Sequence, residues 1–259
     1  MKSAHKEMMK ARRRNICLVV SYDGTNYHGF QRQTPPVIAV QNVLERTLEK
    51  IFGDEIELAA AGRTDAGVHA IGQVVNFFTD GSIPIERVAR AANGLLPPDI
   101  VINNASEASR DFSALHSASR KTYRYRIYNC SVMSPFERNY AWHIAEPLDC
   151  GAMREAMGHL VGEHDFSSFR AAGGADISPV REMDIASISR EGKIITMIFR
   201  ADGFLYHMVR NIVGTLKDVG SGRLMPDDFR SIMDARNRGK ASPTAPAHGL
   251  CLMRVDYEN

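Results

Sequence analysis

The sequence predicts an α+β or mixed α/β fold built from two similar halves, each a largely antiparallel sheet with helices on one face. In both halves, apolar residues recur first at the period of two that is typical of strands and then at the helical period of about 3.6. A composition of 44% hydrophobic and 24% charged residues over 259 residues is that of a globular protein with a sizeable core.

The first half contains two helical patterns between runs of strand character. The clearest helix is amphipathic, with its apolar stripe at Val40, Val43, Leu44, Leu48, Ile51 and Phe52. Pro84 begins a second helix, which Gly94 and the following prolines end. We expect strands at 15–22, 55–60, 73–79 and 100–107.

The second half repeats this mixture after a polar stretch at 106–119. We expect strands at 122–129, 185–189, 194–200 and 250–256, and helices at 150–161 and 204–219. The predicted organisation is a basic N-terminal tail at 1–14, an N-terminal domain at 15–110 and a C-terminal domain at 111–259.

Charge and cysteine content exclude some classes of protein. The net charge of +2 is too small to indicate nucleic-acid binding by itself. The four cysteines lie far apart and no histidines are spaced for a metal, so no metal site is expected. The sequence has no apolar run long enough to span a membrane and no secretory signal, so we expect a cytoplasmic protein.

The basic tail has two interpretations. Its cations are Lys2, Lys6, Lys10, Arg12, Arg13 and Arg14, opposed only by Glu7. A solvated, frayed tail is the more common outcome, and a mobile arm that contacts phosphate is the alternative.

The segment at 61–72 is the strongest candidate for chemistry. Gly62, Gly67 and Gly72 allow tight turns and close approach of a ligand around Asp65, which should lie on a connection between two strands. Composition alone favours a polar hairpin loop in which Asp65 bonds to its own backbone.

A family resemblance outweighs that structural interpretation. The run Ala61-Gly62-Arg63-Thr64-Asp65-Ala66-Gly67-Val68-His69 resembles the signature motif of the tRNA pseudouridine synthase A family. Further segments resemble the family in the same order, at 22–33, 122–125, 162–169, 204–211 and 249–250. The resemblance therefore covers the chain from about Tyr22 to Asp256, and implies the pseudouridine synthase fold with an active-site cleft between the halves.

The resemblance also implies roles for four residues. Asp65 matches the catalytic aspartate, and Arg63 the arginine that enters the RNA and helps to displace the target nucleotide. Tyr123 matches the tyrosine that stacks on the target base; from the strand pattern alone, packing and stacking are equally good interpretations. Arg210 matches an arginine that pairs with the aspartate and would favour its ionised form.

The implied reaction isomerises uridine to pseudouridine at positions 38, 39 and 40 of the tRNA anticodon stem-loop, without a cofactor. The family also implies a homodimer. Arg120, Lys121, Arg124 and Arg170 are candidate phosphate contacts. Ser113 and Leu115 stand where the family commonly has His and Arg, which makes the details of stem-loop docking less predictable.

Two other classes remain as alternatives. A catalytically silent RNA-binding module would use the aromatic and basic strand at 122–129, although the intact Asp65 loop argues against it. A hydrolase with paired carboxylates would use Asp65 together with Asp23 or Asp165 and would release a free base or a cleaved chain.

Overall fold

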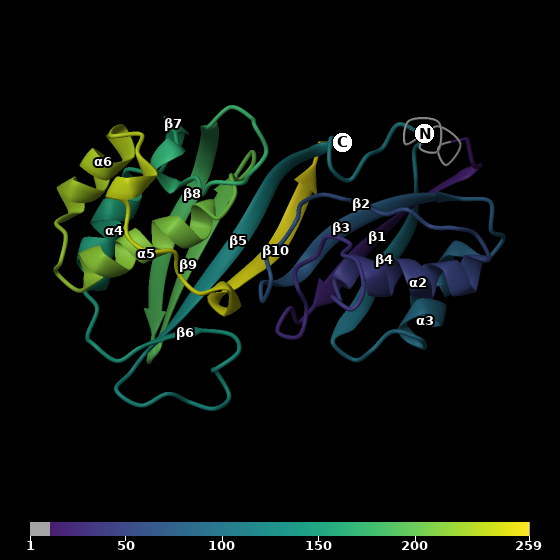
Figure 1. Ribbon diagram of the computed structural model, residues 1–259, viewed down its shortest axis with the longest axis horizontal. Coiled ribbons are helices and arrows are strands. Elements are labelled where there is room, and N and C mark those ends of the chain that lie inside the picture. Colours follow the sequence, from purple (N-terminus) through teal and green to yellow (C-terminus); the bar gives the residue numbers. More distant parts are fainter. Residues whose placement is uncertain (1–10, 259) are drawn as a thin grey trace. The chain divides into compact units, whose positions relative to one another are not determined.

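The structure is a computed structural model that describes residues 11–258, and it divides into two compact units (Figure 1). The first unit contains the described residues up to Ala118 together with those from Leu252 onward, and the second is Ser119–Cys251. The sequence analysis instead put the boundary at Asp111 and the C-terminal strand in the second domain. Because the last strand returns to the first unit, a single cut in the sequence does not separate the two.

The first unit is a sheet with two helices (Figure 1). The order of its strands is β4-β1-β3-β10, with β2 beside β3. Strand β1 pairs antiparallel with both β3 and β4. The elements are β1 (Arg14–Tyr22), α2 (Val40–Phe52), β2 (Ala59–Ala60), β3 (His69–Thr79), α3 (Ile85–Asn93), β4 (Ile100–Ala108) and β10 (Leu250–Tyr257).

Alternation and helical spacing explain the core of this unit. Every second residue of β1 is buried, at Ile16, Leu18, Val20 and Tyr22. The stripe of α2 is buried at Val40, Leu44, Leu48 and Phe52, as its spacing predicts. Helix α2 ends at Gly53, whose left-handed φ of 74° is easily adopted by a residue without a Cβ.

The second unit is a sheet with three α-helices (Figure 1). Its main strand order is β5-β9-β8-β7, all antiparallel, and the short β6 runs parallel to β5. The elements are β5 (Ala118–Asn129), β6 (Trp142–Ile144), α4 (Cys150–Gly158), β7 (Gly162–Asp165), β8 (Val180–Glu191), β9 (Ile194–Ala201), α5 (Met208–Gly220) and α6 (Pro226–Asp234), with short 3-10 turns at Ser167–Phe169, Arg238–Lys240 and Ala247–Gly249.

The pairing of β5 with β9 builds the core of the second unit. Its opposed pairs on the buried face are Tyr123 with Phe199, Tyr125 with Met197, and Ile127 with Ile195. Helix α5 covers apolar surface with Met208, Val209, Ile212, Val213 and Leu216, all buried. These patterns confirm the α+β class and the largely antiparallel sheets.

The predicted strand at 55–60 is wrong over most of its length, because only Ala59 and Ala60 pair with β3. Two backbone N–H groups in this segment donate instead to glutamates of α2: Ile56 to Glu49 at 3.4 Å and Leu58 to Glu45 at 3.0 Å. Side-chain acceptors from the helix thus satisfy donors that a neighbouring strand would otherwise pair.

The helix predicted from Phe204 begins at Met208. His207 immediately before it has a left-handed φ of 59°, which interrupts the helical backbone. Short elements β6, β7 and α6 were not predicted. For α6 a signal was present, since Pro226 followed by Asp227 and Asp228 is typical of a helix start.

No helix among the described residues is both long and apolar enough to cross a membrane.

Candidate functional site

The loop that carries Asp65 connects β2 to β3 and is tied to its surroundings through the backbone. At its start, the N–H of Ala61 donates to Val74 of β3 at 2.8 Å. In its middle, the carbonyl of Thr64 accepts from the N–H of Phe30 at 3.0 Å. The carbonyl of Asp65 accepts from Val68 at 3.1 Å and closes a turn. The loop is therefore an ordered part of the first unit.

Two glycines allow another part of the chain to approach this loop closely. A Cβ on Gly29, whose φ is 85°, would lie 2.7 Å from the carbonyl oxygen of Thr64. A Cβ on Gly24 would lie 2.0 Å from the carbonyl oxygen of Val68. Both distances are too short for real contacts, so the close approach of segment 24–30 to the loop requires glycine at these positions.

Exposure alternates along the loop. Arg63 is exposed, Thr64 is buried and Asp65 is half-buried. The buried Thr64 hydroxyl forms a 2.7 Å hydrogen bond with the hydroxyl of Tyr22 on β1. The anchored Thr64 therefore lies between an arginine that can reach outward and a partly accessible carboxylate, an arrangement compatible with the roles expected of Arg63 and Asp65.

Tyr123 belongs to the second unit and lies on the buried face of β5, with 8% of its surface exposed. Its ring meets that of Phe204 edge to face, with centroids 5.0 Å apart and planes at 84°. The packing interpretation of this tyrosine is thus correct for most of the ring. A ring held in this way is rigid, which a stacking platform also requires.

Arg210 projects from α5 in the second unit and is half-buried. Its Nε donates to the carbonyl of Ala245 at 2.8 Å, and the N–H of Ala245 donates to the carbonyl of Arg210 at 3.1 Å. This reciprocal pair fixes the guanidinium against the segment at 242–246.

A polar network that the sequence analysis missed holds the same segment. The buried Asn211 accepts from the Thr244 hydroxyl at 2.6 Å and from Arg238 Nη2 at 3.1 Å, and its amide donates to Phe169 at 2.8 Å. A fully buried asparagine in the apolar stripe of a helix was the available signal, because such a group must find partners.

The four candidate phosphate contacts are already engaged or partly buried. Arg120 donates to Glu182 at 2.7 Å, which raises its pKa above the ordinary value. Arg170 donates to the backbone carbonyls of Ala175 and Ile177. Burial lowers the pKa of Lys121.

Arg124 differs from the other three because its Nε is buried and lacks a hydrogen-bond partner among the described residues. It therefore retains an unused donor, although that atom is not accessible at the surface.

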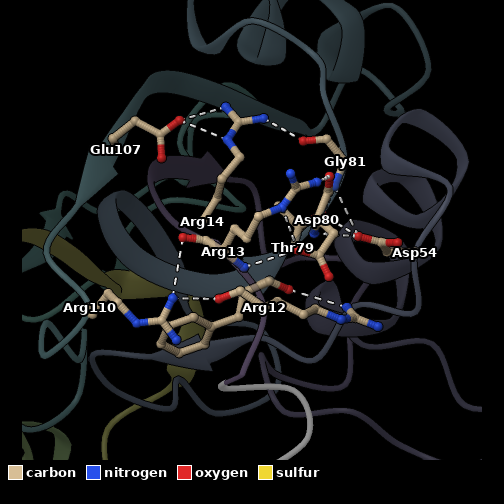
Figure 2. Close-up of polar contacts among 10 residues, drawn as sticks. Arg12, Arg13, Arg14, Asp54, Thr79, Asp80, Gly81, Glu107 and Arg110 are labelled. Carbon is tan, nitrogen blue, oxygen red and sulfur yellow. Dashed lines mark hydrogen bonds and ion pairs between the residues drawn. The ribbon is translucent and has the colours of Figure 1, made fainter.

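The basic residues at the start of the described chain also have partners (Figure 2). Arg13 donates to Asp80 from both its backbone N–H and its Nε, at 3.0 and 3.1 Å. Arg14 binds Glu107 at 2.6 Å and donates to the carbonyls of Gly81 and Ile83. Neither the frayed-tail nor the phosphate-arm interpretation describes these two arginines, while Lys2, Lys6 and Lys10 lie outside the described residues.

Among residues 11–258, no group of three or more His, Cys, Asp and Glu side chains could hold a metal ion.

Comparisons with known proteins match both units. The family model described as tRNA pseudouridine synthase matches residues 18–117 and 156–258. A protein of Moorella thermoacetica called tRNA pseudouridine synthase A is 49% identical over 245 residues, which cover 93% of this chain and 98% of that protein. Proteins of the same name from Pelobacter propionicus and Thermoanaerobacter sp. (strain X514) are 46% and 45% identical, and each alignment covers 94% of this chain and 100% of the relative.

These matches define the class as enzymes that modify RNA by isomerising a nucleoside. The chain belongs to the tRNA pseudouridine synthase family. The match includes the second part of β1, the Asp65 loop, α5 and the return of β10 to the first unit, so it concerns both units and not a borrowed motif.

Proposed function

We propose that this protein converts uridine to pseudouridine at positions 38, 39 and 40 of the tRNA anticodon stem-loop, with Asp65 as its catalytic residue. The reaction breaks the bond from N1 of uracil to C1′ of the ribose, turns the base, and joins C5 to C1′. A proton leaves C5 and N1 gains one, so atoms balance without a redox partner or group donor. The observation that carries the proposal is the half-buried Asp65 on a loop anchored on both sides, in a chain of this family.

The proposed roles of the other residues follow their chemistry. Arg63 is exposed beside Asp65 and is proposed to occupy the place of the displaced nucleotide. Tyr123, braced by Phe204, is proposed to stack on the target base. Arg210, with its Nε tied to Ala245, is proposed to orient the aspartate and stabilise its ionised form.

For the partners, we propose a homodimer that binds the anticodon stem-loop in the cytoplasm, where Arg120, Lys121, Arg124 and Arg170 contact phosphate. Family membership supports this assembly. The intramolecular bonds of Arg120 and Arg170 mean that RNA phosphates would have to compete for these donors or share them. Light scattering of the purified protein should give a mass of twice 28.8 kDa, and a monomer would contradict the dimer.

The test is to incubate unmodified tRNA with the protein and map pseudouridine by carbodiimide labelling and primer extension. For the parent we expect stops that report pseudouridine at positions 38–40, each one nucleotide 3′ of the modified base. Asp65→Asn keeps the shape of the side chain but can neither attack nor accept a proton, and should lower the rate by at least about a thousandfold while tRNA still binds.

Asp23→Asn is the matched control, because a hydrolase would need a second carboxylate and the isomerase does not. This variant should still form pseudouridine. Release of free uracil by the parent would indicate the hydrolase, and an unchanged tRNA would indicate the silent binding module. Turnover by Asp65→Asn would contradict the role of the aspartate.

A further inference from the structure

A buried glutamine on β3 lies directly behind the Asp65 loop. Gln73 is fully buried, and its Nε2 donates to the carbonyl of Gly62 at 2.9 Å. The same nitrogen lies 3.5 Å from the hydroxyl of Tyr22, which in turn bonds the hydroxyl of Thr64 at 2.7 Å. Gly62 and Thr64 flank Arg63, and Thr64 directly precedes Asp65, so this chain of bonds holds the loop from behind.

The orientation of the Gln73 amide follows from its neighbours. The carbonyl of Gly62 can only accept a hydrogen bond, so the NH₂ group must face it. Gln73 Nε2 can only donate to the Tyr22 hydroxyl, and either hydroxyl can be the donor in the bond between Tyr22 and Thr64. The bonds therefore connect β3 through β1 to the residue before the aspartate.

This arrangement leaves one polar atom without a partner. Gln73 Oε1 is buried and has no hydrogen bond within residues 11–258. A buried acceptor without a donor destabilises the folded state, and an apolar side chain of the same length would remove that cost. The neighbouring positions on β3, Val74 and Val75, are apolar and buried. Stability alone therefore does not favour an amide at position 73.

We propose that Gln73 is a positioning residue, which uses its bonds to Gly62 and Tyr22 to hold the Asp65 loop in the geometry that the reaction needs. The proposal rests on the catalytic role of Asp65. A reacting group displaced by about 1 Å can lose about a hundredfold in rate, so a residue that never touches the substrate can still affect the chemical step strongly. Native proteins retain such destabilising groups where function requires them.

The test compares Gln73→Met with a control on the same strand. Methionine keeps the length of glutamine, lacks both donors and removes the unpartnered acceptor. Thr79→Val is the control: Thr79 is also fully buried on β3, but its hydroxyl bonds Asp54 at 2.6 Å, away from the Asp65 loop. Each variant is assayed as full-length protein by single-turnover pseudouridine formation at saturating enzyme, by tRNA affinity and by thermal unfolding.

We expect Gln73→Met to slow the single-turnover rate by about ten- to a hundredfold, with the tRNA Kd within about twofold of the parent. The melting temperature should stay close to that of the parent, because removal of the unpartnered Oε1 offsets the loss of the bond to Gly62. Thr79→Val should show the opposite pattern, a lower melting temperature with an unchanged rate. Tyr22→Phe removes only the hydroxyl between Gln73 and Thr64, and should slow the rate in the same direction as Gln73→Met.

A parental rate in Gln73→Met would overturn the proposal, as would a slow rate explained by weaker tRNA binding or by unfolding. If the parent forms pseudouridine and Asp65→Asn does not, the proposed function holds, and a failure of the Gln73→Met test contradicts only the positioning role of Gln73. If the parent forms none, the proposed function itself is wrong.

Discussion

The Asp65 loop and the Arg210 helix each present one side chain, but they are held in opposite ways. In the first unit the side chain is short and its backbone is irregular, so the supporting bonds go to the backbone at Gly62 and Thr64. In the second unit the helix already fixes the backbone of Arg210. The supporting bond is therefore made by the guanidinium of its long side chain, whose Nε donates to the carbonyl of Ala245. The fold thus supports whichever part of the residue would otherwise be mobile.

The supports also differ in charge. Behind the Asp65 loop they are neutral, namely an amide, a phenol and backbone groups. Behind Arg210 they include a second guanidinium, since Arg238 donates to Asn211 and Thr244, the neighbours in sequence of Arg210 and Ala245. The supports of Arg210 therefore add a positive charge to its surroundings, whereas the supports of the Asp65 loop add none.

The largest effect after loss of Asp65 should come from the charge of Arg210. Arg210→Met preserves length and packing but removes the guanidinium, and we expect a single-turnover rate lower by about a hundredfold. Arg210→Lys restores the charge without the planar donors, and should recover only part of the rate because it cannot bond Ala245 and an anion in the same geometry. Equal rates for Lys and Met would show that geometry, and not charge, is the contribution of this residue.

A smaller effect is expected from the network behind Arg210. Thr244→Val removes the hydroxyl that bonds Asn211 while keeping the shape of the side chain. We expect about 1 to 2 kcal/mol less stability, because the buried Asn211 oxygen keeps only its bond from Arg238, and a rate about three- to tenfold lower. Thermal unfolding and single-turnover kinetics measure the two changes.

Combining Thr244→Val with Gln73→Met tests whether the hydrogen-bond network behind Arg210 and the one behind the Asp65 loop affect the rate independently. Gln73 bonds Gly62 and Tyr22, whereas Thr244 bonds Asn211 and Arg238, so the two networks are built from different residues. If the two networks are independent, the fold-loss of rate in the double variant should equal the product of the two single losses within about a factor of two. A double variant no slower than Gln73→Met alone would mean that both act on one common element.

Much of the scaffold followed from periodicity. The alternation of β1 and the stripe of α2 depend on neighbours within a few residues, so the sequence predicted their bounds to within a residue. The strand at 55–60 failed because Glu45 and Glu49 take its donors, a tertiary interaction that no local pattern contains. Helix α6 was missed although Pro226, Asp227 and Asp228 are typical of a helix start, and although α3 and α4, which are equally short, were predicted.

The candidate site divides in the same way. The glycines and charges of the Asp65 loop are close together in the sequence, and so is the motif that carries the family resemblance. The hydrogen bonds behind the loop could not be predicted in this way, because Gln73 and Tyr22 lie 51 positions apart and Tyr22 and Thr64 lie 42 apart. A glutamine in an apolar strand and an asparagine in an apolar helical stripe were visible as polar exceptions, but their partners required the fold.

The smallest expected effect is a change in the pKa of two aspartates outside the site. One of them is stabilised by neutral hydrogen-bond donors and the other by a charged arginine. Asp54 in the first unit accepts from the Thr79 hydroxyl and the N–H of Asp80, and these hydrogen bonds lower its pKa. Asp184 in the second unit is bound bidentately by Arg200, at 2.6 and 3.0 Å, and this charged donor lowers its pKa.

Because both folded-state pKa values are depressed, each carboxylate stabilises the fold above its unfolded pKa of about 4, and that stability is lost as the pH falls through the folded pKa. Salt should separate the two cases. Exposed ion pairs are screened at 1 M salt, where the Debye length is about 3 Å, whereas short hydrogen bonds from neutral donors are screened much less. Carboxyl titration by NMR should therefore show the pKa of Asp184 rising toward its ordinary value in salt while that of Asp54 changes little. Equal rises at both aspartates would mean that the charge of the nearby Arg12, and not the hydroxyl and amide donors, sets the pKa of Asp54.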